Sequence, residues 1–115
     1  MKVIIAGSRT ITKYDAVSNA IQWSGFEITE VVSGGAIGVD TIAERWAADK
    51  GIEVKRFDAN WDLLGKAAGP VRNAEMAQYA DALIAVWDGK SRGTMSMINL
   101  ARKEGLQVHV QLIGS

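Results

Sequence analysis

Hydrophobic and polar positions follow two strand-like patterns along the chain. Residues 2–7 (KVIIAG) and 82–87 (ALIAVW) are apolar almost throughout, as strands buried on both faces of a parallel sheet are. Residues 30–33 (EVVS) predict another strand. Residues 53–57 (EVKRF) and 107–112 (QVHVQL) alternate polar with apolar side chains, which is typical of partly solvated edge strands. We therefore expect five strands, with the two most apolar in the centre.

Helical periods separate these strands. Apolar residues recur at spacings of three and four in two segments, at Val39, Ile42, Ala43, Trp46 and Ala47 and again at Met97, Ile98 and Ala101, with Thr94 in the same period. Each segment predicts a helix with one buried face. Both helices are followed by a glycine suited to a left-handed cap, Gly51 and Gly105. Residues 14–23 and 71–79 predict two more helices, the second after the only proline, Pro70.

The succession of strand, helix and strand predicts right-handed crossovers and a parallel sheet covered on both faces. Placing the apolar strands in the middle and the alternating ones at the edges gives the order 3-2-1-4-5, numbered along the chain. The expected fold is a Rossmann-like three-layer α/β sandwich with a five-stranded parallel sheet. In such sheets ligands bind where the strand order reverses, here between the first and fourth strands.

Composition narrows the function classes. A chain of 115 residues that is 48% hydrophobic suits one domain over residues 1–115. Thirteen basic and thirteen acidic residues cancel, so no overall field draws the protein to nucleic acid or a membrane. The absence of cysteine excludes thiol chemistry, and a single histidine disfavours a zinc site. No signal peptide or membrane-spanning run is present, so we expect a cytoplasmic protein.

Three glycine-bearing segments follow strands that end at the same edge of the sheet. GSR (residues 7–9) follows the first strand, SGGAIGVD (33–40) the second and WDGKSRGT (87–94) the fourth. Glycines permit a tight turn from strand to helix, and bare amides at a helix start bind phosphate. We predict that the glycines of SGGAIGVD serve both purposes.

Four motifs taken in order resemble one family. GSR, SGGAxGVD, GPxRNxxM and DxxIAxWDGxSxGT are similar to the YspA-like, cpYpsA-related branch of the SLOG superfamily, which also contains the LOG phosphoribohydrolases and the DNA-processing protein DprA. The resemblance spans nearly the whole chain. It implies a Rossmann-like fold that binds nucleotides or nucleotide-derived ligands, in several relatives as sensors.

The resemblance also implies roles for particular residues. In LOG-type enzymes the matching glycines embrace the phosphate of a nucleoside monophosphate; these positions are Gly34, Gly35, Gly38, Gly93 and Thr94. Arg72 matches an arginine of those enzymes, and it is the one catalytic candidate. The glutamate that follows their GT motif is absent, because Met95 stands after Thr94. Binding without turnover is therefore favoured over hydrolysis of an N-glycosidic bond.

The full predicted ligand site contains Gly7, Ser8, Arg9, Ser33, Gly34, Gly35, Ala36, Gly38, Asp40, Arg72, Asn73, Trp87, Asp88, Gly89, Ser91, Gly93 and Thr94. We expect no resident metal and no required cofactor, although a Mg²⁺ ion can accompany a phosphate ligand. A homo-oligomer, either dimer or tetramer, is expected from the resemblance.

Several of these residues have a structural alternative. Arg9 can pair with a ligand phosphate or with Asp88. Asp40 can contact a ribose or a Mg²⁺ ion, or simply favour the first turn of its helix. Asp88 can contact the ligand or shape its turn, and Ser8 and Ser91 have the same two options. For Ser91 the turn is favoured.

The aromatic residues divide in the same way. Trp46 lies on a buried helical face and is expected in the core. Trp87 ends a central strand and Trp61 lies in the longest irregular segment, residues 57–73; either can stack on a base or fill space. His109 alternates with Val108 and is expected at the surface.

Three functions remain open. The favoured one is capture of a nucleotide-derived molecule, such as ADP-ribose, cyclic ADP-ribose, NAD or a nucleotide second messenger. The second is hydrolysis of a nucleotide with Arg72 and Asp88 or Asp40 in new roles. The third is single-stranded nucleic acid binding, which zero net charge disfavours.

Overall fold

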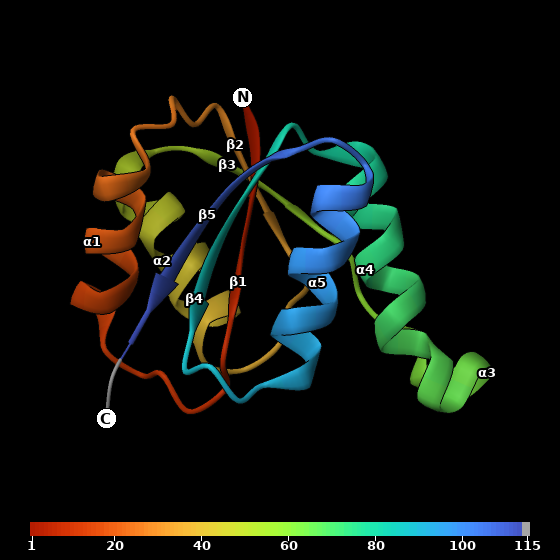
Figure 1. Ribbon diagram of the computed structural model, residues 1–115. Helices are drawn as coiled ribbons and strands as arrows, with labels where there is room; N and C mark the ends of the chain where they lie inside the picture. The colour runs from red at the N-terminus through yellow and green to blue at the C-terminus, as the bar shows by residue number, and fades with distance from the viewer. Residues whose placement is uncertain (114–115) are drawn as a thin grey trace.

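The strands of the computed structural model, which describes residues 1–113, form one parallel sheet (Figure 1). Their bounds are β1 Lys2–Gly7, β2 Glu30–Ser33, β3 Glu53–Arg56, β4 Ala82–Trp87 and β5 Gln107–Leu112. The sheet order is β3-β2-β1-β4-β5 and every neighbouring pair is parallel. The order predicted from strand hydrophobicity is thus confirmed.

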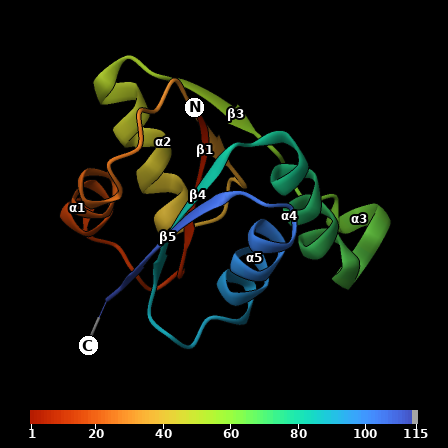
Figure 2. The same ribbon diagram turned by 45° about the horizontal axis from the view of Figure 1, so that its top comes forward.

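Helices cover both faces of this sheet. Their bounds are α1 Tyr14–Ser24, α2 Val39–Lys50, α3 Trp61–Leu64, α4 Ala68–Tyr79 and α5 Arg92–Lys103, with a short 3₁₀ helix η1 at Gly65–Ala67. Figures 1 and 2 show α1 and α2 on one face and α4 and α5 on the other, with α3 projecting from the end of α4. The Rossmann-like three-layer arrangement is confirmed.

Strand β1 contributes to two hydrophobic clusters because its side chains alternate between the faces. Val3 and Ile5 pack with α1 and α2, whereas Ile4 and Ala6 pack with α4 and α5. A continuous apolar run is therefore required in this strand. Trp46 joins the first cluster and is 8% exposed, which confirms its place in the core.

The segment expected to be irregular, residues 57–73, is largely helical, and that prediction was wrong. It forms α3 and η1, and α4 begins at Ala68 instead of residue 71. The Asn60 side chain caps α3 by accepting a hydrogen bond from the Leu63 amide over 3.1 Å. Pro70 lies in the first turn of α4, where its missing N–H costs no helical hydrogen bond.

Two loop features agree with the sequence patterns. Gly51 and Gly105 adopt positive φ values of 68° and 78° after α2 and α5, as expected of left-handed helix ends.

Within residues 1–113, no helix is long and apolar enough to cross a membrane.

Candidate functional site

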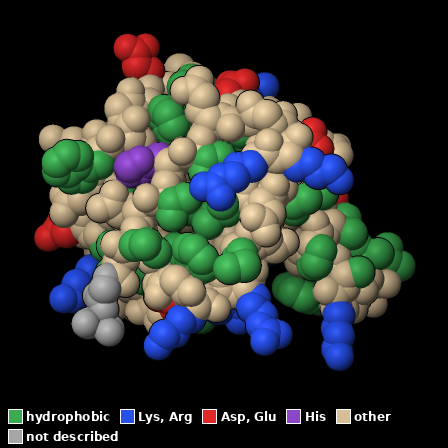
Figure 3. Space-filling model, in the orientation of Figure 1, with side chains coloured by type: hydrophobic (Ala, Val, Ile, Leu, Met, Phe, Trp, Pro, Cys, Tyr) green, Lys and Arg blue, Asp and Glu red, His purple; other side chains and the backbone are tan. Residues whose placement is uncertain are grey.

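A cavity of about 510 Å³ opens at the carboxyl edge of the sheet. It lies between the ends of β1 and β4, with Ala6 of β1, Met76 of α4 and Met97 of α5 among its lining residues. This edge lies at the bottom of Figure 1, and basic side chains gather there in Figure 3, which has the same orientation. The cavity therefore occupies the predicted ligand position, where the strand order reverses.

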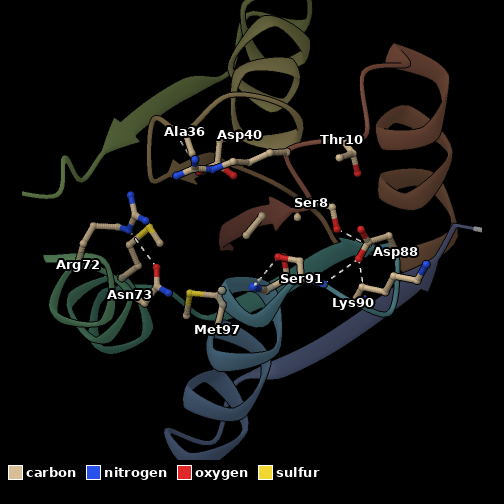
Figure 4. Close-up of a pocket in the computed structure, with 16 residues that line it drawn as sticks. Ser8, Thr10, Ala36, Asp40, Arg72, Asn73, Asp88, Lys90, Ser91 and Met97 are labelled. Atoms are coloured by element: carbon tan, nitrogen blue, oxygen red, sulfur yellow. Dashed lines mark hydrogen bonds between the residues drawn. The ribbon is translucent and has the colours of Figure 1, made fainter. Parts of the chain in front are cut away.

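Arg72 stands at one end of this cavity (Figure 4). Its Nη1 donates a hydrogen bond to the main-chain oxygen of Gly34 over 2.6 Å, and its Nε donates to Asn73 Oδ1 over 2.9 Å. Asn73 is itself buried. These bonds occupy two of the five guanidinium N–H groups. The charge is thus held in place while other donors remain for a ligand anion.

Gly34 makes the position of Arg72 possible. A Cβ atom added to Gly34 would stand 2.6 Å from Arg72 Nη1 and 2.9 Å from Asp40 Oδ2. Both distances are below ordinary van der Waals contact, so any side chain at Gly34 would displace a charged group. The glycine therefore allows close approach of an arginine from α4, a purpose that the sequence does not reveal.

Asp40 is a buried acid in the first turn of α2, 6% exposed and in the cavity wall. Burial raises the pKa of its carboxyl group from 3.8 to about 6, opposed by the Ala36 amide and the Arg72 charge. Its Oδ2 accepts the Ala36 amide hydrogen over 3.3 Å. The carboxyl group is consequently ionised at neutral pH but protonated in mild acid.

Two amides of the glycine segment after β2 donate hydrogen bonds to side chains at the ends of that segment, Ser33 of β2 and Asp40 of α2. The Gly35 amide donates to Ser33 Oγ over 3.1 Å, and the Ala36 amide donates to Asp40. Gly35 and Gly38 have φ values of 71° and 82°, which favour glycine. The turn-forming purpose of these glycines is evident, whereas their phosphate contact stays a prediction.

The first turn of α5 offers a better anion site. Ser91 caps this helix, since its Oγ accepts hydrogen bonds from Thr94 N over 3.3 Å and from Thr94 Oγ1 over 3.1 Å. Among residues 1–113, no acceptor is paired with the amides of Arg92 and Gly93. Such amides and the helix dipole favour a negative group. Gly93 and Thr94 also line the cavity.

Asp88 shapes the turn that leads into α5. Its Oδ1 accepts the Lys90 amide over 2.8 Å and the Ser91 amide over 2.9 Å, and its own amide donates to Ser8 Oγ over 3.1 Å. The hydrogen bonds from these two amides lower the pKa of the Asp88 carboxyl group.

Both salt bridges among residues 1–113 belong to Arg56, so the alternative pairing of Arg9 with Asp88 is wrong.

Comparison with known proteins assigns the chain to a family. Residues 1–63 match the YspA, cpYpsA-related SLOG family. Gene 61 protein of Mycobacterium phage D29 is 38% identical over 117 aligned positions, which cover 93% of each chain. The chain belongs to the SLOG family.

Two solved structures share the fold of this SLOG chain. DNA processing protein A (DprA) from Streptococcus pneumoniae superposes with a TM-score of 0.75 at 23% identity, over 95% of this chain and 49% of the other. DprA from Helicobacter pylori gives a TM-score of 0.72 at 24% identity, over 96% and 64%. The SLOG chain thus spans about half to two thirds of the DprA chains.

The structure brings most of the predicted ligand residues together. Those that line the cavity are Gly7, Ser8, Arg9, Ala36, Asp40, Arg72, Asn73, Asp88, Ser91, Gly93 and Thr94. Those outside its lining are Ser33, Gly34, Gly35, Gly38, Trp87 and Gly89. Gly34, Gly35 and Gly38, outside the lining, allow close approach between their own backbone and neighbouring atoms. A Cβ on Gly38, for example, would lie 2.7 Å from the Ser8 main-chain oxygen.

Trp87 and Trp61, the two proposed base-stacking residues, are not in the cavity lining. Trp87 donates its indole N–H to the Ser91 main-chain oxygen over 3.0 Å. Trp61 packs beside Gly69, where an added Cβ would stand 3.5 Å from the indole. Neither indole is positioned to stack on a ligand inside this cavity.

Five lining residues were not predicted. They are Ala6, Thr10, Met76, Lys90 and Met97. Lys90 already lies within the segment WDGKSRGT (87–94), and Thr10 directly follows GSR (7–9), so taking that first segment one position further would have included it. Met76 and Met97 belong to the core cluster under α4 and α5. Their side chains meet both the core and the cavity.

Proposed function

We propose that the chain binds a nucleotide-derived small molecule, whose phosphate lies at the first turn of α5. Membership of the SLOG family supports binding related to nucleotides or nucleic acids. The observation that carries the proposal is the pair of amides at Arg92 and Gly93, for which residues 1–113 provide no acceptor, with Gly93 in the lining of a cavity that also contains Arg72. A phosphate there gains donors and a nearby cation.

The dimensions and charges of the cavity suit such a ligand. Its volume of about 510 Å³ falls within the usual range for small-molecule pockets. Its lining contains three basic residues, Arg9, Arg72 and Lys90, and two acidic ones, Asp40 and Asp88. Cations attract the phosphate, while carboxylates accept hydrogen bonds from sugar hydroxyls. Ala6, Met76 and Met97 form an apolar part of the lining.

Binding without turnover is favoured over hydrolysis. Each carboxylate of the cavity already accepts main-chain hydrogen bonds, Asp40 from Ala36 and Asp88 from Lys90 and Ser91. A general acid or base must reach the reacting bond, and Met95 stands after Thr94, where the LOG-type enzymes have a glutamate. We therefore propose a protein that senses or sequesters its ligand. A Mg²⁺ ion with the phosphate and a homo-oligomer remain predictions.

Single-stranded nucleic acid is a second candidate. The Helicobacter pylori DprA structure is described by its single-stranded DNA binding mode. Here the carboxyl-edge loops and the adjoining helices carry exposed basic residues at Arg9, Lys13, Lys66, Lys90 and Arg92. Figure 3 shows several basic side chains along the lower edge of the molecule. Binding through such a surface would weaken steeply with salt.

The test is a ligand-capture experiment. The purified protein is incubated with a pool of nucleotides, NAD, ADP-ribose and cyclic nucleotides, and the bound and unbound fractions are identified by mass spectrometry. Retention of an intact compound supports the proposal. Cleaved base or sugar phosphate indicates a hydrolase instead. Retention of none, with salt-sensitive binding of an oligonucleotide, favours the second candidate.

A further inference from the structure

A second cavity of about 660 Å³ adjoins the first. The two cavities share three lining residues, Thr10, Asp88 and Lys90. Figure 4 shows all three at the end of the first cavity that lies away from Arg72 and Asn73. The second cavity therefore begins where the first one ends, beside the turn that leads into α5.

The remaining walls of the second cavity combine an apolar floor with a polar rim. Ile11 is 7% exposed, and Ala16 and Ile113 are half-buried against the core under α1 and α2. Thr12 and Lys13 are exposed and complete the rim. Such a lining suits a ring with polar substituents better than it suits another phosphate alone.

The boundary between the cavities carries groups that can hold the middle of a ligand. Lys90 is a cation shared by both cavities, and it precedes Ser91, the cap of α5. Asp88 beside it is an acceptor for sugar hydroxyls. A phosphate at the first turn of α5 therefore lies next to the entrance of the second cavity, and a group attached to that phosphate has space to enter.

We propose that the ligand is a nucleotide whose phosphate carries a second sugar or nucleoside through a pyrophosphate linkage, and that this second group occupies the cavity formed around Ile11, Ala16 and Ile113. The proposal rests on the proposed function, because it takes the nucleotide half to bind in the first cavity. The second cavity then selects pyrophosphate-linked compounds over simple mononucleotides.

Matched ligand pairs test this selection. Calorimetry would compare AMP with ADP-ribose, GMP with GDP-mannose, and UMP with UDP-glucose, since each pair differs by the added phosphate and sugar. For the base that the protein accepts, we expect the pyrophosphate-linked member to bind about tenfold more tightly or better. The corresponding nucleoside diphosphate measures the contribution of the added phosphate by itself.

Two variants separate the cavities. Thr12→Trp and Ala16→Leu should each reduce that preference by about fivefold or more, with mononucleotide affinity unchanged within about twofold. Asn19→Trp, an exposed position of α1 outside both linings, is the matched control. Circular dichroism verifies folding, and Thr12 is exposed, so its variant should fold.

The outcomes are distinct. Equal affinity for the two members of a pair, or a preference unchanged in folded Thr12→Trp, would overturn the second cavity as a binding site while leaving the proposed function intact. A preference fully reproduced by the nucleoside diphosphate would do the same. Absence of binding by these compounds would overturn this inference, and absence of binding by the whole pool of the capture experiment as well would refute the proposed function.

Discussion

The Arg72 guanidinium donates a 2.6 Å hydrogen bond to the main-chain oxygen of Gly34, across 38 positions of sequence. This contact joins helix α4 to the glycine loop after β2 and holds a positive charge at one end of the cavity. The motif glycine and the motif arginine are therefore parts of one arrangement, and changes at either residue should affect binding through the other.

Replacing Arg72 should weaken ligand binding. Arg72→Ala removes a charge-assisted hydrogen bond, and we expect a loss of about 1.5–3 kcal/mol in binding free energy. Arg72→Lys retains the charge but not the planar fork, and should recover part of the loss. Calorimetry with the captured ligand gives both values. Arg102→Ala, at an exposed position in the last turn of α5, is the control, and an equal loss there would contradict the prediction.

Gly34→Ala tests the same arrangement from the other side. The added methyl group would stand 2.6 Å from Arg72 Nη1, so the guanidinium must move and we expect a loss of affinity comparable to that of Arg72→Ala. The double variant should then be little worse than either single variant, because both act on one contact. Additive losses, measured in the same calorimetric assay, would show that the two residues act separately.

Replacing Gly7 should lower the stability of the fold. A Cβ there would lie 2.1 Å from the Val86 main-chain oxygen and 2.7 Å from Val39 Cγ2, so Gly7→Ala must disturb the pairing of β1 with β4. We expect the free energy of unfolding in urea to fall by about 1–3 kcal/mol or more. Gly93→Ala is the matched control, since nothing lies within 4 Å of its added Cβ, and it should be neutral or stabilising.

The raised pKa of Asp40 predicts that the free energy of unfolding depends on pH. Its pKa rises from 3.8 to about 6 in the folded protein, so between these values the folded state holds a proton that the unfolded chain has released. The free energy of unfolding therefore falls as the pH rises from about 4 to about 6, and this contribution is constant at higher pH. The pKa difference corresponds to about 3 kcal/mol as an upper limit.

The measurement compares urea unfolding of the wild type and Asp40→Asn from pH 4 to 7. Because other carboxyl groups titrate in both proteins, the difference between the two curves isolates Asp40. We expect Asp40→Asn to be relatively more stable at pH 7 than at pH 4, since it has no buried charge to desolvate. Parallel curves would show that the pKa of Asp40 is not raised.

The order of the strands could be predicted from the sequence because the burial of each strand determines the pattern of apolar residues within it. Continuous apolar runs identified β1 and β4 as central, and alternation identified β3 and β5 as edges, which gave the sheet order. Residues 57–73 were misjudged, since Ala68 and Pro70 carry no strong apolar period. The helical turns there depend on a cap at Asn60 and on the tolerance of proline in a first turn.

One part of the candidate site could be predicted from the sequence, and the other part depends on the tertiary structure. The sequence by itself determined which loops meet at the carboxyl edge, because parallel strands end together. Only the tertiary structure decided which amides those loops leave unpaired. Ser33 and Asp40 accept hydrogen bonds from the amides of Gly35 and Ala36, whereas the amides of Arg92 and Gly93 in α5 have no acceptor in the described part of the chain. Hydrogen bonds compete for the same donors in three dimensions, and no spacing of glycines records which acceptor prevails.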